Sequence, residues 1–386
     1  MSTREIIYLD NAATTYPKPE SVYGAVEQVL RQLGANPGRG AHRLASEGER
    51  VLDAARRRIA ELFAIAEPDH IVFTKNATEA LNMAIKGCAG RGGHVVTTTL
   101  EHNSVMRPLG ALKARGLSVT RVRVAPNGRF DLKTLQRAIR RTTRLVVVTH
   151  ASNVTGALLP IAEMGAICRA KGVPLCVDAA QTAGSIEIDV ERDAIDLLAC
   201  PGHKGLLGPQ GTGFLYVRPG VEVETLMEGG TGSVSEREEQ PSFYPDRLQS
   251  GTPNTPGIAG LAAGVEYLLK TSLATIRRNE AELTKRLLEG LKGIRGVVIH
   301  GPKGIRGRVA VVSFTLKGTN PGEVGYILDE AFGIMVRTGL HCAPGTHKIL
   351  GTYPEGTIRV SPGPFSTPDH VDALCEAARQ VASLRR

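Results

Sequence analysis

The feature that most constrains the fold is an alternation of short apolar runs and helical patterns through the middle of the chain. Six runs rich in valine and leucine are typical of strands: 94–99, 117–124, 144–149, 173–178, 196–200 and 212–217. Between them lie helical patterns such as 103–115, 131–140 and 161–171. Uniformly apolar strands suit burial on both faces. The alternation therefore predicts an α/β fold with a mostly parallel sheet and helices on both sides.

Beyond about residue 257 the pattern changes. One long helical pattern covers 256–293. Strands are predicted at 297–300 and 309–316, and helices near 322–332 and 368–384. These elements predict a smaller α+β unit that begins inside the long helix. The polar stretch 230–249 between the two parts reads as a local hairpin or loop.

Composition sets further limits. The chain has 386 residues, of which 42% are hydrophobic, enough for one large core and a smaller one. It contains no apolar run of about 18 residues and no basic start followed by an apolar stretch, so we expect a cytoplasmic protein without a membrane span. The net charge of +9 comes from scattered arginines, and only 4% of residues are aromatic. We expect a solvated basic surface and no nucleic-acid partner.

Polar residues follow four of the predicted strands. In open α/β sheets, ligands bind outside the carboxyl ends of the strands. These ends carry imidazole, amide, carboxylate and amine groups, at 101–103, 150–153, 178–181 and 202–204. A single polar strand end would mean little, but four together predict a binding site.

Lys204 and Asp178 are the strongest candidates at these strand ends. Lys204 lies between Gly202 and Gly205, which allow the backbone to approach a ligand closely. A buried carboxylate such as Asp178 keeps the ring nitrogen of a pyridine cofactor protonated, as pyridoxal 5′-phosphate (PLP) requires. Taken alone, Lys204 could be a surface lysine, and Asp178 could be the N-cap of the segment 179–183.

Thr78 and His102 are two further candidates. The segment 76–81 follows the apolar run 71–73 and reads as the start of a helix with Thr78 near its N-terminus. Free N–H groups and the helix dipole favour a phosphate there, although an ordinary helix cap is the alternative. His102 could stack on a flat cofactor or carry a proton, or it could be a core histidine.

The chain has six cysteines and no C-x-x-C pair, and no spacing suggests a metal site. Cys342 differs from the others because glycines and a proline flank it, in Gly339 to Gly345. We expect an exposed thiol on a mobile loop. Positive charge that favours the reactive thiolate could come from nearby basic residues: Arg337, His341, His347 and Lys348. An incidental loop thiol is the alternative.

Taken together, these residues resemble the class V aminotransferase family, and within it the cysteine desulfurases and selenocysteine lyases. The likeness covers nearly the whole chain and is carried by residues 8–13, 78–79, 101–103, 152–156, 177–181, 202–204, 251–255, 337–343 and 359–361. Residues 38–42 resemble the Suf-type group. The resemblance implies a fold type I PLP-dependent transferase with a seven-stranded sheet. It also implies an N-terminal segment 1–20 associated with the small domain, a large domain 21–262 and a small domain 263–386.

The resemblance also implies roles. Lys204 would carry the cofactor, Asp178 would pair with its ring nitrogen, and Gln181 would contact its ring hydroxyl. His102 would stack on the ring. The cofactor and its phosphate would be held by Ala77, Thr78 and His203, together with Thr252 of the neighbouring subunit in a homodimer with shared sites. The substrate carboxylate would be bound by Asn153 and Arg359, and by Arg39 near the dimer interface. Family members usually have Ser or Thr where this chain has Pro201, which has neither a hydroxyl nor an N–H group.

Several functions fit this pattern. The first is a cysteine desulfurase that converts L-cysteine to L-alanine, takes the sulfur on Cys342 and passes it to an acceptor protein. That acceptor could be an iron–sulfur scaffold, a thiolation enzyme or a sulfur carrier. Selenocysteine lyase activity on L-selenocysteine would use the same groups, and an aminotransferase, an epimerase or a C–S lyase are relatives. The non-enzymatic alternative is a PLP-binding regulator or scaffold.

Overall fold

The computed structural model describes residues 6–38 and 40–384. Its main element is a seven-stranded sheet in the order β2-β8-β7-β6-β5-β3-β4. Its strands are β2 (Ile71–Thr74), β3 (His94–Thr98), β4 (Ser118–Val122), β5 (Thr143–Thr149), β6 (Leu175–Asp178), β7 (Leu197–Pro201) and β8 (Gly213–Val217). Adjacent strands pair in parallel except β8, which is antiparallel to β2 and β7. The predicted mostly parallel sheet is confirmed.

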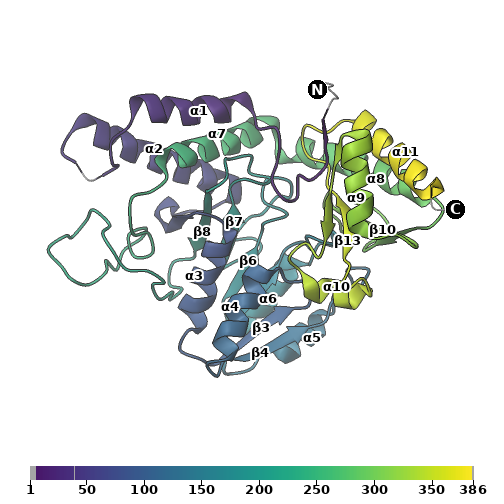
Figure 1. Ribbon diagram of the computed structural model, residues 1–386. Coiled ribbons are helices and arrows are strands. Elements are labelled where there is room, and N and C mark those ends of the chain that lie inside the picture. The colour runs from purple at the N-terminus through teal and green to yellow at the C-terminus, as the bar shows by residue number, and fades with distance from the viewer. Residues whose placement is uncertain (1–5, 39, 385–386) are drawn as a thin grey trace.

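Helices cover both faces of this sheet (Figure 1). In β5, Val146 and Val148 join one core while Leu145 and Val147 join the other, as the two-residue period of a strand requires. The first core includes buried residues of α2 (Arg43–Phe63), α5 (Leu132–Ala138), α6 (Ile161–Ala170) and α7 (Thr255–Thr271). The second takes α3 (Ala77–Ala89) and α4 (Asn103–Lys113). Helix α1 (Glu20–Gln32) packs on the outer side of α7.

The C-terminal part forms a second layered unit. Its antiparallel sheet has the order β12-β13-β10-β9, made of Arg337–Gly339, Thr357–Val360, Val312–Leu316 and Val297–His300. Its core includes buried residues of α8 (Leu273–Lys292), α9 (Pro321–Phe332) and α11 (Pro368–Ser383). The short helix α10 (Pro344–Leu350) follows β12. Strand β1 (Ile7–Tyr8) pairs with β11 (Ile334–Met335), so the N-terminal segment joins this unit.

The single long helix predicted over 256–293 is wrong. The chain forms α7 and α8, separated at Ser272, which has φ 67° and ψ 137°. The Ser272 hydroxyl accepts a hydrogen bond from the backbone N–H of Thr275 and caps α8. Apolar spacing continues across the break and neither Gly nor Pro marks it, so the sequence pattern could not reveal it. The predicted domain limits at 262 and 263 stay a prediction.

The connection between β8 and α7 is a long irregular segment. Within it, the predicted hairpin-or-loop stretch 230–249 contains neither a helix nor a strand, so it is a loop. None of the helices built from residues 6–38 and 40–384 is both long and apolar enough to cross a membrane.

The loop after β6 touches the backbone that follows Lys204, and Gly184 makes this possible. Gly184 has φ 91°, and a Cβ atom there would lie 2.0 Å from the Gly205 carbonyl oxygen. We expect Gly184→Ala to lower the free energy of unfolding by about 2–5 kcal/mol through backbone strain and overpacking.

In α4, a Cβ atom on Gly110 would meet nothing within 4 Å. Gly110→Ala should therefore raise stability by about 0.5–1 kcal/mol. Urea unfolding midpoints check both, and equal midpoints would contradict the argument.

Candidate active site

A cavity of about 280 Å³ lies at the carboxyl edge of the large sheet. Thr149, Asp178 and Pro201, the last residues of β5, β6 and β7, line it. The cavity brings together most of the predicted site residues: Ala77, Thr78, His102, Asn153, Asp178, Gln181, His203, Lys204 and Cys342. Segments far apart in sequence thus meet where the parallel strands end.

Lys204 follows β7 and lies in a buried environment. Burial, assisted by the positive charge of Arg359, lowers the pKa of Lys204 to about 8. With a pKa of about 8, about a tenth of the amine is neutral and nucleophilic at pH 7. Burial also raises the pKa of Asp178, whose Oδ1 accepts a hydrogen bond of 3.0 Å from the backbone N–H of Ala180. Asp178 therefore also anchors the following turn, as its alternative role anticipated.

Two helix N-termini also line the cavity. The Asn76 side chain caps α3 by accepting from the Glu79 N–H at 3.0 Å, and Thr78 lies in the first turn. The His102 ring caps α4 by accepting from the Ser104 N–H at 3.0 Å. Sequence reasoning missed Asn76 and Ser104. The spacing of Asn76 and Glu79 could have revealed the cap, whereas no local signal marked Ser104.

The two histidines of the cavity are neutral. Burial, followed by the charge of Lys204, lowers the pKa of both His102 and His203 to about 4. Neutral imidazoles can stack on a flat ring or donate a hydrogen bond without adding charge to the site.

Cys342 lies over this cavity on a short anchored segment. Its carbonyl oxygen accepts from the Asn103 N–H at 2.8 Å, and the His341 carbonyl oxygen accepts from Asn153 Nδ2 at 2.6 Å. Both His341 and Cys342 have positive φ angles, 49° and 57°. The thiol is exposed, as expected. The loop itself is short, because Gly339 belongs to β12 and α10 begins at Pro344, and its expected mobility stays a prediction.

The predicted charge around the thiol also needs correction. His341 is 2% exposed and His347 is fully buried, and desolvation lowers their pKa values to about 2 and about 4. Neither can supply positive charge at neutral pH. The Lys348 Nζ atom lies over the Tyr353 ring, 5.0 Å from the ring centroid. Of the four predicted basic residues, Arg337 lies beside the thiol and can supply positive charge, with its Nη2 atom 3.7 Å from Cys342 Sγ.

Two predicted residues of the described part of the chain, Arg359 and Thr252, do not line the cavity. Arg359 is fully buried, donates from Nη2 to Asp10 Oδ1 at 2.6 Å and from Nη1 to the Asn153 carbonyl oxygen at 3.2 Å. Its role toward a substrate carboxylate stays a prediction, and Arg337 is the arginine among the described residues that lines the cavity. Thr252 is exposed and lies outside it. Arg39 falls outside the described residues.

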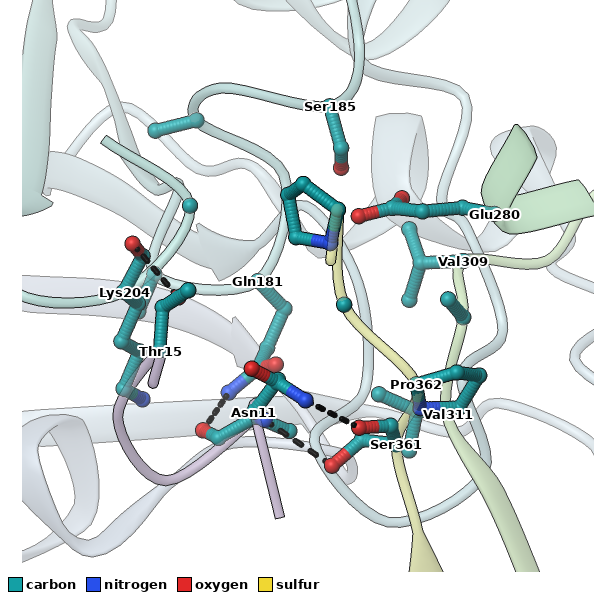
Figure 2. A pocket seen from close by; sticks show the side chains of 17 residues that line it. Asn11, Thr15, Gln181, Ser185, Lys204, Glu280, Val309, Val311, Ser361 and Pro362 are labelled. Atoms are coloured by element: carbon teal, nitrogen blue, oxygen red, sulfur yellow. Dashed lines mark hydrogen bonds between the residues drawn. The ribbon is translucent and has the colours of Figure 1, made fainter. Parts of the chain in front are cut away.

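A second cavity, of about 50 Å³, lies behind Lys204 and Gln181 (Figure 2). The N-terminal segment closes the site from this side: Thr15 Oγ1 donates to the Lys204 carbonyl oxygen at 2.8 Å, and Gln181 Nε2 donates to the Ala12 carbonyl oxygen at 3.1 Å. Glu280 of α8 extends into this cavity, where burial raises its pKa to about 7.

The groups of the larger cavity fit pyridoxal phosphate. Lys204 offers a largely desolvated amine and Asp178 a buried carboxylate, the two groups that this cofactor needs at its aldehyde and its ring nitrogen. The first turn of α3 offers N–H and hydroxyl donors suited to a phosphate. Pro201 lines the cavity without adding such a donor.

A mostly parallel α/β sheet with a lysine and a carboxylate at its carboxyl edge defines a fold type I enzyme. The chain belongs to the class V aminotransferase family, whose model matches residues 7–374.

Comparisons with known proteins narrow this family further. The chain is 38% identical to a probable cysteine desulfurase of Methanothermobacter thermautotrophicus, over 99% of this chain and 96% of the relative. It is 36% identical to a probable cysteine desulfurase of Pyrococcus abyssi, over 99% and 96%. The solved apo structure of cysteine desulfurase from Thermococcus onnurineus is similar with a TM-score of 0.92 and 35% identity, over 98% of this chain and 95% of that one.

Glu101, beside the site, makes stability depend on pH. It is buried, accepts a hydrogen bond from Thr98 Oγ1 at 2.5 Å, and burial raises its pKa from 4.5 to about 8. The unfolded chain loses this proton above pH 4.5 while the folded chain keeps it until about 8. Stability from Glu101 is therefore complete below pH 4.5 and falls as the pH rises to about 8.

We expect Glu101→Gln to remove this loss, because glutamine does not titrate. Urea unfolding at pH about 5 and about 8 should show a smaller decline in the variant than in the wild type. The histidines with lowered pKa values act in the opposite direction, but equally in both proteins, so the difference isolates Glu101. If the free energy of unfolding declined equally in the wild type and the variant, Glu101 would be ionised in the folded protein.

Proposed function

We propose that this chain is a PLP-dependent cysteine desulfurase that converts L-cysteine to L-alanine and takes the sulfur on Cys342. One observation carries the proposal: an exposed thiol is held over the same cavity as Lys204, with the Arg337 guanidinium 3.7 Å from its sulfur. The names of the relatives point the same way. We further propose that the sulfur passes to an acceptor protein in the cytoplasm.

The side chains divide the chemistry among them. When bound, PLP supplies an electron sink for the substrate α-carbon. Lys204 Nζ takes the α-proton, for which a lowered pKa suits it. Cys342 Sγ then attacks the substrate sulfur as a thiolate: an S–S bond forms, the substrate C–S bond breaks, and its electron pair stays with the carbon skeleton. Arg337 is placed to stabilise the attacking anion.

The position of Arg337 also suits recognition of the substrate carboxylate. Arg359 is already paired with Asp10, so an incoming carboxylate reaches it only by competing with that ion pair. Arg337 lines the cavity directly. We therefore propose that Arg337 shares carboxylate recognition with Asn153 and Arg359.

Removing the thiol tests the proposed reaction. Cys342→Ala should keep the visible absorbance of bound PLP, because the thiol is not among the groups proposed to hold the cofactor. It should lose alanine formation from L-cysteine by about 100-fold or more, because no nucleophile remains to take the sulfur. Lys204→Ala should lose both. Cys88→Ala is the matched control, since burial raises the pKa of that thiol to about 12.

Alanine formation at the wild-type rate in Cys342→Ala would contradict sulfur transfer through this residue. Loss of cysteine turnover with retained alanine formation from selenocysteine would instead identify a selenocysteine lyase, in which the C–Se bond breaks, its electron pair stays with the carbon skeleton and selenium leaves as the element without attack by a thiol.

We also propose a homodimer with shared sites, in which Thr252 of one chain contacts the cofactor phosphate of the other. The proposal is supported by the exposure of Thr252, by its place outside its own cavity, and by the absence of a hydroxyl at Pro201.

Subunit complementation tests this assembly. Lys204→Ala and Thr252→Ala chains should each be impaired alone, the first because it lacks the amine and the second because both phosphates lose a contact. A mixed dimer contains one site in which both residues are intact, so mixing should raise activity above that of either parent. Subunit exchange is verified by differently tagged chains. Exchange without a rise in activity would argue against shared sites.

A further inference from the structure

The excess positive charge of the chain lies in one segment, 103–144, which forms α4, β4, α5 and the start of β5. The segment contains eleven lysines and arginines and a single acidic residue, Asp131. Elsewhere, aspartates and glutamates match the lysines and arginines almost one for one, so the segment accounts for the net charge of +9. All eleven cationic side chains are exposed, and Asp131 pairs with one of them, Arg137, at 3.9 Å. The unbalanced charge is thus concentrated, not scattered.

Three of these cations, Arg107, Arg121 and Arg123, lie on the same side of the large sheet. β4 is an edge strand, and successive side chains of a strand point to opposite faces. Val122 belongs to the first core, whereas Val119 packs against the second core, which contains α4. Arg121 and Arg123 therefore project on the side of α4, where Arg107 is exposed. We call these three arginines the α4–β4 basic surface.

The α4–β4 basic surface adjoins the segment that carries the exposed thiol. The N–H of Asn103, the first residue of α4, donates to the Cys342 carbonyl oxygen at 2.8 Å, and Arg107 follows about one helical turn later. A Cβ atom on Gly345 of α10 would lie 3.5 Å from the carbonyl oxygen of Thr99, which follows β3. Helix α10 accordingly lies beside the β3–β4 end of the sheet (Figure 1). One partner could therefore touch the arginines and the thiol at the same time.

We propose that the α4–β4 basic surface docks an acidic face of the protein that accepts sulfur from Cys342. The inference deepens the proposed desulfurase function and rests on it. In the transfer, a thiolate of the acceptor attacks the outer sulfur of the Cys342 persulfide. A new S–S bond forms, the S–S bond to Cys342 breaks, and its electron pair returns to Cys342 Sγ, which leaves as a thiolate.

The absence of acidic neighbours favours a charged partner at this surface. None of Arg107, Arg121 and Arg123 forms an ion pair with any residue of 6–38 or 40–384, so all three charges are available to a partner. Opposite charge on the acceptor would speed its encounter with the enzyme and set its orientation. Single-stranded RNA is also an anion, but it binds largely by stacking bases on aromatic rings. The one aromatic residue of 103–144 is Phe130, which packs against the first core.

A pair of model acceptors tests the surface. Two labelled peptides of equal length carry one cysteine flanked by glutamates or, in the matched peptide, by glutamines. Binding to enzyme that carries PLP is measured by fluorescence anisotropy at about 0.15 M salt, with serine in place of the cysteine. The glutamate peptide should bind the variant Arg107→Gln/Arg121→Gln/Arg123→Gln about tenfold more weakly than the wild type. Sulfur transfer to its cysteine form should slow similarly, whereas alanine formation with dithiothreitol as acceptor should stay unchanged.

The control variant removes the same charge elsewhere. Arg57→Gln/Arg278→Gln/Lys285→Gln changes three exposed cations of α2 and α8, and it should bind the glutamate peptide like the wild type. Equal weakening in both triple variants would overturn the inference, because net charge and not this surface would then be responsible. So would equal binding of the two peptides to the wild type.

Two further outcomes separate the competing explanations. A single-stranded RNA that bound the wild type more tightly than the glutamate peptide, and lost this affinity in the Arg107, Arg121 and Arg123 variant, would assign the surface to nucleic acid and overturn the inference. Peptide binding needs no turnover. A wild type that formed no persulfide on Cys342 would therefore contradict the desulfurase proposal, while anisotropy would still test the surface.

Discussion

The geometry of the site depends on one buried ion pair, between Asp10 and Arg359. The Arg359 guanidinium is fully buried, and a buried charge is costly unless it is paired. This pair joins the N-terminal segment to β13, and Arg359 also donates to the carbonyl oxygen of Asn153, in the loop that follows β5. The Asn153 side chain in turn holds the backbone of His341, next to Cys342. Three distant parts of the chain are thereby fixed around one cavity.

Burial also sets the protonation of the groups inside that cavity. Desolvation lowers the pKa of Lys204 and of His102 and raises that of Asp178, so each group is shifted toward its neutral form. A phosphorylated, charged cofactor would alter this balance, because a cationic ring nitrogen favours the ionised form of Asp178. The site is thus arranged for a ligand that brings complementary charges.

Much of this could be predicted from sequence, because the relevant signals are local. Valine- and leucine-rich runs revealed the strands, and polar residues directly after them revealed Asp178 and Lys204. Properties that depend on tertiary contacts could not be predicted in this way. Nothing local shows that His341 is buried and neutral, or that Ser104 meets Thr78 across two helices. The break at Ser272 was hidden because its positive φ occurs at a residue other than glycine.

Sulfur transfer through Cys342 is tested by following the sulfur atom itself. The enzyme is given one equivalent of L-cysteine without reductant, digested under acidic conditions and examined by peptide mass spectrometry. We expect a mass increase of one sulfur atom on the peptide that contains Cys342, and none on peptides with the buried cysteines Cys168, Cys176 and Cys200. Alanine formed in full yield with Cys342 unmodified would contradict it.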